Sequence, residues 1–276
     1  VVKIKSARGL NPNSGSGFIV KGEVLSDRWR GKRLLVTNFH VISPGAVFDG
    51  SFAPEQAEAV FSALQNQPEV RVGEILWCSP FDAHDCTILD MPALPDGACA
   101  LDLVNFAEPN PRFHPDGRAI GQLNVIGHPQ GNPLAMATRG TDWYELRAET
   151  KTLVDESELD IEYLFYNSPT QPGSSGSPVV DACTLELVGL HHASRSAKFP
   201  ESRRPELSRQ AEISRRPGTP QRAMRYRSKY RARHNKPAPS QKARMVTAKV
   251  NEGLWLQDIK NAVARFPDGV PNVRTP

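Results

Sequence analysis

The sequence predicts an all-β protein that is built from many short strands. Its 276 residues include 24 Pro and 20 Gly, and its apolar residues come in short runs between turn residues, which is typical of strands rather than of long helices. A chain of this length can bury a substantial core, and it fits two barrels that form one unit. The sequence has no apolar run of about 18 residues or more, so we expect no membrane-spanning helix and no membrane partner.

The first half of the chain contains apolar runs that predict its strands. Residues 14–25 are expected to form a strand that begins with glycines, and residues 33–42 are apolar almost throughout, as expected of a strand buried on both faces. His40 lies at the end of this second run. Further strands are expected within residues 57–64 and 69–78, with a helix as the alternative around residues 54–65.

The second half has similar short apolar runs and ends in a different pattern. Residues 256–266 carry apolar side chains at helical spacing, at Leu256, Ile259 and Val263, and predict a C-terminal helix. The strands expected before this helix lie within residues 121–131, 134–139, 143–149, 161–167, 178–180 and 185–193.

Residues 171–180 (Gln-Pro-Gly-Ser-Ser-Gly-Ser-Pro-Val-Val) combine a tight polar turn with the start of an apolar strand. A turn of this kind can hold the hydroxyl of Ser175 in a fixed, exposed place. Its glycines allow the backbone N–H groups of Gly173 and Ser175 to point at a common spot, as the donors to an oxyanion do. An ordinary β-turn is the alternative for this stretch taken alone.

A serine hydroxyl becomes a good nucleophile beside a base, and the base needs an acid that fixes its tautomer. His40, in the run Thr37-Asn38-Phe39-His40, is the candidate base. Asp85 directly precedes the apolar strand of residues 86–89 and is the expected acid. Asp82 is the other candidate, but its place in the preceding loop is typical of a solvated turn residue.

The order His40, Asp85, Ser175 and the motifs around these residues resemble bacterial trypsin-like serine peptidases. Each motif is weak alone, whereas three in this order are a strong signal. The resemblance implies a chymotrypsin-like fold of two six-stranded Greek-key β-barrels with the site between them. It divides the chain into a first barrel with His40 and Asp85 (residues 1–100), a connector (residues 101–118), and a second barrel with Ser175 (residues 119–276), which carries a basic insertion (residues 194–249) and the C-terminal helix.

The resemblance also implies a serine endopeptidase that cleaves proteins or peptides through an acyl-enzyme. Ser175 would attack the substrate carbonyl, His40 would take its proton, and Asp85 would stabilise the imidazolium. The N–H groups of Gly173 and Ser175 would bind the oxyanion. No metal ion and no organic cofactor is implied.

Thr170 and His191 are the candidates for the side chains that select the substrate. Thr170 lies five residues before Ser175, and His191 follows the apolar run of residues 187–190. The pair resembles that of glutamyl endopeptidases and picornavirus-type proteases, which implies a preference for Glu or Gln before the scissile bond. His192 is an equal candidate for the pocket residue, and the alternative is that all three are merely polar residues at strand ends.

Residues 194–249 form a basic segment that differs from the rest of the chain. They contain 17 Lys and Arg against three acidic residues, a net charge of +14, whereas the remainder carries −10. Such a segment cannot bury enough apolar surface to form a core. We expect a mobile regulatory loop that can gate the cleft. The alternatives are self-cleavage and the binding of nucleic acid or another anionic partner, which the tyrosines within residues 225–233 favour.

Four cysteines without a C-x-x-C spacing predict free thiols and a cytoplasmic setting. The chain has no initiator Met and no signal-peptide pattern, which indicates a processed end or a domain of a longer protein that a partner or fused module regulates. Two rival functions are a non-catalytic binding module with the fold of a protease, and a nucleic-acid-binding protein that acts through residues 194–249.

Overall fold

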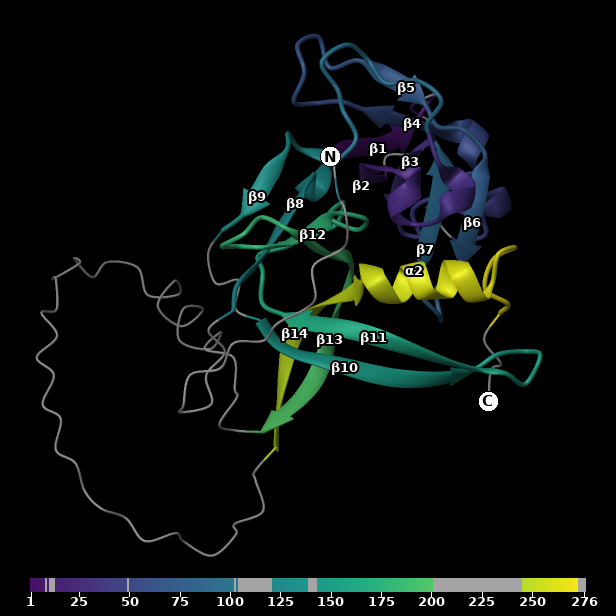
Figure 1. Ribbon diagram of the computed structural model, residues 1–276. Helices are drawn as coiled ribbons and strands as arrows, with labels where there is room; N and C mark the ends of the chain where they lie inside the picture. The colour runs from purple at the N-terminus through teal and green to yellow at the C-terminus, as the bar shows by residue number, and fades with distance from the viewer. Residues whose placement is uncertain are drawn as a thin grey trace, which may run out of the picture.

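The computed structural model has two antiparallel β-sheets of seven strands each and, in its described part, one α-helix (Figure 1). The described residues are 1–7, 9, 13–48, 50–101, 103, 121–138, 143–200 and 245–272. The predicted all-β class with two chymotrypsin-like halves is confirmed. Each sheet has seven strands rather than the predicted six, and in each a strand of only three residues lies at one edge.

The first sheet has the strand order β5-β4-β1-β2-β3-β7-β6. Its strands are β1 (Val2–Ser6), β2 (Ser14–Lys21), β3 (Arg33–Thr37), β4 (Ala57–Val60), β5 (Glu69–Arg71), β6 (Ile75–Ser79) and β7 (Cys86–Asp90). Short 3-10 turns connect them at Gly22–Val24, Asp27–Trp29, Pro44–Ala46 and Pro54–Gln56. The alternative of a helix around residues 54–65 is wrong, because the last of these turns leads directly into β4, which pairs with β1.

The second sheet has the strand order β10-β11-β14-β13-β12-β8-β9. Its strands are β8 (Leu123–Gly127), β9 (Ala135–Ala137), β10 (Trp143–Thr152), β11 (Glu158–Tyr166), β12 (Pro178–Asp181), β13 (Leu187–Pro200) and β14 (Met245–Trp255). A 3-10 turn at Pro129–Gly131 follows β8. The turn of residues 171–177 leads into β12, which lies between β13 and β8 in the interior of this sheet.

Strands β13 and β14 form a long two-stranded ribbon that extends beyond the rest of the sheet (Figure 1). Their pairing runs from Gly189 with Trp255 to Pro200 with Met245. The sequence analysis placed the basic insertion at residues 194–249. In the structure, β13 continues to Pro200, and its partner strand β14 begins at Met245. The rest of the basic segment, residues 201–244, and most of the expected connector, residues 101–118, lie outside the described residues.

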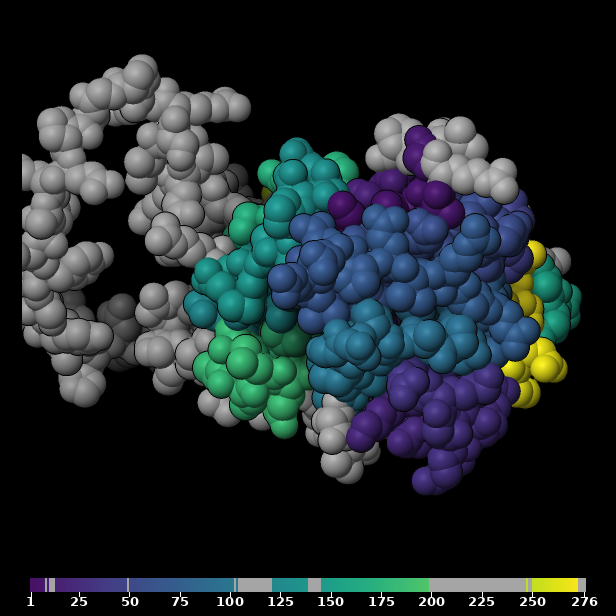
Figure 2. Space-filling view, turned by 90° about the horizontal axis from the view of Figure 1, so that it is seen from above, coloured from purple at the N-terminus to yellow at the C-terminus, as the bar shows by residue number. Residues whose placement is uncertain are grey.

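One apolar core continues from the first sheet into the second. Phe18 and Trp77 belong to the same buried cluster as Phe165, Leu254 and Ile259. A second cluster, around Leu35 and Leu89, fills the other side of the first sheet. Figure 2 shows the same continuity from outside, because the blue surface of the first half lies directly against the teal and green surface of the second. The two halves therefore form one folded unit.

Helix α2 (Leu256–Arg265) joins the end of the chain back to the first half. Its buried face consists of Leu256, Ile259, Ala262 and Val263, as the helical spacing predicted. Trp77 Nε1 of β6 donates a hydrogen bond to the carbonyl of Phe266 (2.8 Å), just past the helix. The helix crosses between the two sheets (Figure 1).

None of the described helices has the length and apolar character needed to cross a bilayer. All four cysteines are free thiols.

Candidate active site

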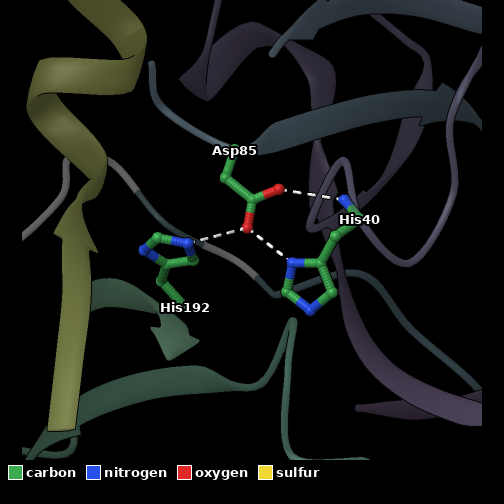
Figure 3. A group of neighbouring side chains, drawn as sticks. All are labelled: His40, Asp85 and His192. Carbon is green, nitrogen blue, oxygen red and sulfur yellow. Dashed lines mark hydrogen bonds and ion pairs between the residues drawn. The ribbon is translucent and has the colours of Figure 1, made fainter. Parts of the chain in front are cut away.

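His40 and Asp85 are joined by two hydrogen bonds (Figure 3). His40 Nδ1 lies 2.6 Å from Asp85 Oδ2, and the backbone N–H of His40 donates to Asp85 Oδ1 over 2.9 Å. The side chain of His40 is 26% exposed, whereas that of Asp85 is fully buried. The structure thus brings the predicted base and acid together, with the ring of His40 held from both its backbone and its Nδ1.

The loop between β6 and β7 holds Asp85 in an unusual backbone conformation. Its φ of 42° lies in the left-handed region, which Asp tolerates better than most residues. Its N–H donates to the carbonyl of Pro80, and its own carbonyl accepts from Asn38 Nδ2 over 2.9 Å. Asp82, the other sequence candidate, is exposed in the preceding turn.

The turn before β12 presents Ser175 at its tip. Gly173 and Gly176 both have left-handed φ angles, of 90° and 85°, which glycine adopts without strain. The turn is anchored at three points: Ser16 donates its N–H to the carbonyl of Ser175 (2.8 Å), Gly176 donates to the carbonyl of His191 (3.0 Å), and Ser16 Oγ donates to the carbonyl of Gly173 (2.8 Å).

Two N–H groups of this turn have no internal acceptor. Those of Ser174, Gly176 and Ser177 donate within the protein, but those of Gly173 and Ser175 donate to no atom of the described residues. These are the two groups that the sequence predicted as oxyanion donors. They are therefore free to bind a ligand oxygen.

Ser175, Gly173 and His40 line one cleft of 420 Å³. The other walls come from both halves of the chain and include Asn13, Ser14, Val41, Phe52, Gln130 and Pro172. In the described residues no hydrogen bond joins the Ser175 hydroxyl to His40. Contacts of this kind often shorten only in the complex with substrate.

His191 and Thr170 each make a side-chain hydrogen bond next to the nucleophile turn (residues 171–177, with the predicted nucleophile Ser175). His191 Nδ1 lies 2.7 Å from the hydroxyl of Tyr166. Burial, and then the nearby His192 and His40, lower the pKa of His191 to about 3, so that this ring is neutral at neutral pH. Thr170 Oγ1 donates to Asn251 Oδ1 over 2.9 Å.

The comparison with known proteins gives the family. Residues 15–190 match the sequence profile of the trypsin-like peptidase domain. The chain belongs to the trypsin-like peptidase family. Among solved structures it is similar to the Rv3671c protease from Mycobacterium tuberculosis, in the active form (18% identity, 70% of each chain, TM-score 0.45) and in the inactive form (18% identity, 70% of this chain and 76% of that chain, TM-score 0.44). No curated protein sequence matches the chain.

In this trypsin-like peptidase, His192 lies against Asp85. Its Nε2 is 3.1 Å from Asp85 Oδ2, and its Nδ1 is 3.0 Å from Glu252 Oε1 (Figure 3 shows the first contact). The ring is buried, with 8% of the side chain exposed. The sequence offered His192 as a residue of the substrate pocket, and the structure places both of its ring nitrogens on carboxylates.

Sequence reasoning missed Glu252 and Arg195, which extend this contact. Arg195 Nε forms an ion pair with Glu252 Oε2, and its guanidinium also pairs with Glu149. One feature of the sequence could have indicated this contact: Glu252 is the single charged residue in the expected strand Val250-Asn251-Glu252-Gly253-Leu254. A charged residue at a buried strand position generally has a charged partner.

His40, Asp85 and His192 are also the one set of described residues whose ligand atoms could surround a metal ion, since these atoms lie within 4.8 Å of one another. Ligands around a tetrahedral zinc ion, with bonds of about 2.0–2.1 Å, keep about 3.3 Å between them. The contacts of 2.6 Å and 3.1 Å are shorter than this. The set therefore fits direct pairing of the side chains better than a metal centre.

Aromatic rings cover the outer side of the His-Asp pair. Phe81 contacts His40 edge-on, with 5.9 Å between ring centroids, and contacts His192 at 5.4 Å. Phe48 lies 5.3 Å from Phe81. The Asp85 carboxylate beneath these contacts is fully buried, and the lower dielectric of a buried site strengthens its interaction with both histidines.

Proposed function

We propose that the chain is a serine endopeptidase that cleaves proteins or peptides through an acyl-enzyme. The observation that carries the proposal is the 2.6 Å hydrogen bond between His40 and Asp85, beside a cleft that His40 shares with Ser175 and Gly173. The two free N–H groups of the nucleophile turn lie in the same segment as Ser175. Membership of the trypsin-like peptidase family supports the same activity.

The reaction uses these groups in two half-reactions. Ser175 Oγ forms a bond to the scissile carbonyl carbon while His40 Nε2 takes the hydroxyl proton, and Asp85 stabilises the imidazolium. His40 then gives this proton to the leaving amine as the C–N bond breaks, which leaves the acyl-enzyme. A water molecule releases the acyl group by the same steps. The N–H groups of Gly173 and Ser175 bind the oxyanion in both tetrahedral intermediates, and one such donor contributes about 10²–10³ in rate.

The test is covalent labelling with a fluorophosphonate, read by intact mass spectrometry. The wild type should gain one label per chain, and Ser175→Ala should gain none. Ser177→Ala is the matched control, because its hydroxyl is buried in the same turn and has no hydrogen-bond partner in the described structure, so its labelling should be unchanged. A folded wild type without label would contradict the proposal and favour the non-catalytic binding module.

For the substrate we propose Gln, in preference to Glu, before the scissile bond. The hydroxyl of Tyr166 has no acceptor other than His191 Nδ1 in the described structure, so the proton of this neutral ring is on Nε2 and can be donated. The proton of Thr170 Oγ1 is used by Asn251, so this oxygen can only accept. One donor and one acceptor match a carboxamide, whereas a carboxylate can only accept.

Two peptides that differ only in Gln or Glu at this position test the preference. Leaving Thr170 without a donor costs about 1–3 kcal/mol, so kcat/KM should favour Gln by about tenfold or more. Thr170→Val, which removes the acceptor, should lower kcat/KM for Gln and remove most of the difference between the peptides. A preference for Glu or for Arg would contradict the pocket proposal without affecting the result of the labelling.

A further inference from the structure

We propose that His192 is a positioning residue for the reaction, which holds the Asp85 carboxylate from the side away from His40 and connects it to Glu252 and Arg195 on the β13–β14 ribbon. The proposal rests on the serine peptidase function given above. Figure 3 shows the arrangement: the Asp85 carboxylate lies between two imidazole rings, one from each half of the chain. His192 does not reach the reacting atoms, so it acts through Asp85.

A β-bulge explains why His192 can reach Asp85. In the β13–β14 ladder His191 pairs with Gly253 and Ala193 pairs with Glu252, so His192 is the extra residue between them. A bulge changes the direction of the side chains around it. As a result, His191 contacts Tyr166 of β11, whereas the next residue contacts Asp85 of the first half.

The contacts of Asp85 leave its carboxylate little freedom to rotate. Oδ1 accepts from the backbone N–H of His40. Oδ2 accepts from His40 Nδ1 at 2.6 Å and also forms an ion pair with His192 Nε2 at 3.1 Å. This second contact lacks the direction of a good hydrogen bond, so its attraction is mainly electrostatic. Without it, Oδ2 would have a single partner, on the side of His40.

The surroundings of His192 favour the imidazolium. A carboxylate lies near each ring nitrogen, Asp85 at Nε2 and Glu252 at Nδ1, and only the protonated ring has an N–H for both. Burial acts to lower the pKa of His192, but the hydrogen bond to Glu252 and the charges of Asp85 and Glu252 outweigh it and raise that pKa, with Arg195 opposing. The neighbouring His191 is neutral. His40 lies 6.2 Å away between ring centroids.

The contact with His192 makes a prediction for the reaction. Without it, the Asp85 carboxylate can rotate more freely and holds the His40 ring less precisely, so kcat should fall.

The experiment compares two substitutions of His192. His192→Phe keeps a ring but has no N–H, and we expect kcat to fall about 10²-fold, as for a misplaced catalytic group, with KM nearly unchanged. His192→Gln keeps a neutral donor toward Asp85 and should recover part of kcat.

His84→Gln is the matched control. His84 is also buried, and its Nε2 also lies 3.1 Å from a carboxylate, that of Asp258. It touches neither His40 nor the Asp85 side chain in the described structure, so this variant should lose stability while kcat stays the same.

A measurement without turnover separates this inference from the proposed function. In the Ser175→Ala background, the proton on His40 Nδ1 should give a downfield NMR resonance, because it lies in a short charged hydrogen bond. His192→Gln should shift or broaden this resonance, and His84→Gln should not. An unchanged resonance in the His192 variant would overturn the inference even in a protein without activity. An active wild type with unaltered kcat in both His192 variants would overturn it as well.

Discussion

His191, proposed above as a residue of the substrate pocket, also affects the stability of the protein. Its folded-state pKa of about 3 lies below its usual value of 6.5, so between these values the unfolded chain binds more protons than the folded one. The free energy of unfolding should therefore fall as the pH is lowered, by at most about 1.4 kcal/mol per pH unit from this residue. Urea unfolding of wild type and His191→Gln from about pH 7 to about pH 4 should show a smaller slope in the variant. Equal slopes would mean that His191 is protonated in the folded state.

At the scale of single residues, the sequence predicted the contact of His40 with Asp85 but not that of His192 with Asp85. The first follows from local motifs on neighbouring strands. The second depends on a bulge between two strands that are separated by the basic segment, and pairing register across such a distance leaves no local pattern in the sequence. His191 and His192 were equivalent in the sequence because they are adjacent. One extra residue in the ladder gives them different neighbours.

At the scale of the element, the nucleophile turn depends on how closely it approaches β2. A Cβ on Gly176 would overlap the carbonyl oxygen of Ser16 and approach Thr37 Oγ1, and its φ of 85° is unfavourable for alanine. Gly176→Ala should destabilise the protein by about 2–5 kcal/mol, the sum of backbone strain and overpacking, and abolish labelling of Ser175. Gly31→Ala is the control, since its φ is 80° but no atom lies within 4 Å of its Cβ. It should cost about 1–2 kcal/mol in urea unfolding and leave labelling intact.

The elements themselves were largely predictable, and their errors have simple causes. Runs such as residues 33–37 and 86–90 contain enough buried apolar residues to define strands on their own. The edge strands β5 and β9 are short and mostly exposed, so no apolar run marks their limits. The ribbon residues beyond 194 form no continuous apolar run. They pair through backbone hydrogen bonds, which the composition of the segment does not indicate.

At the scale of the whole molecule, Asp258 of α2 holds the two halves together. One of its carboxylate oxygens contacts His84 Nε2 of the first half (3.1 Å) and accepts from the N–H of Glu162 in β11 (3.0 Å). Asp258→Ala should lower the free energy of unfolding by about 3 kcal/mol, because it leaves a buried histidine without its partner. Asn261→Ala, at an exposed position of the helix, should change it by less than about 0.5 kcal/mol. A double-mutant cycle with His84→Ala should give a coupling energy clearly different from zero.

The contact between α2 and the loop that carries Asp85 also sets an order of events during synthesis. His84, next to Asp85, meets its carboxylate partner only 174 residues later in the chain. When the ribosome has released His40, Asp85 and Ser175, the first half still lacks this contact with α2. A newly made chain would thus reach its full stability only after β14 and α2 have emerged.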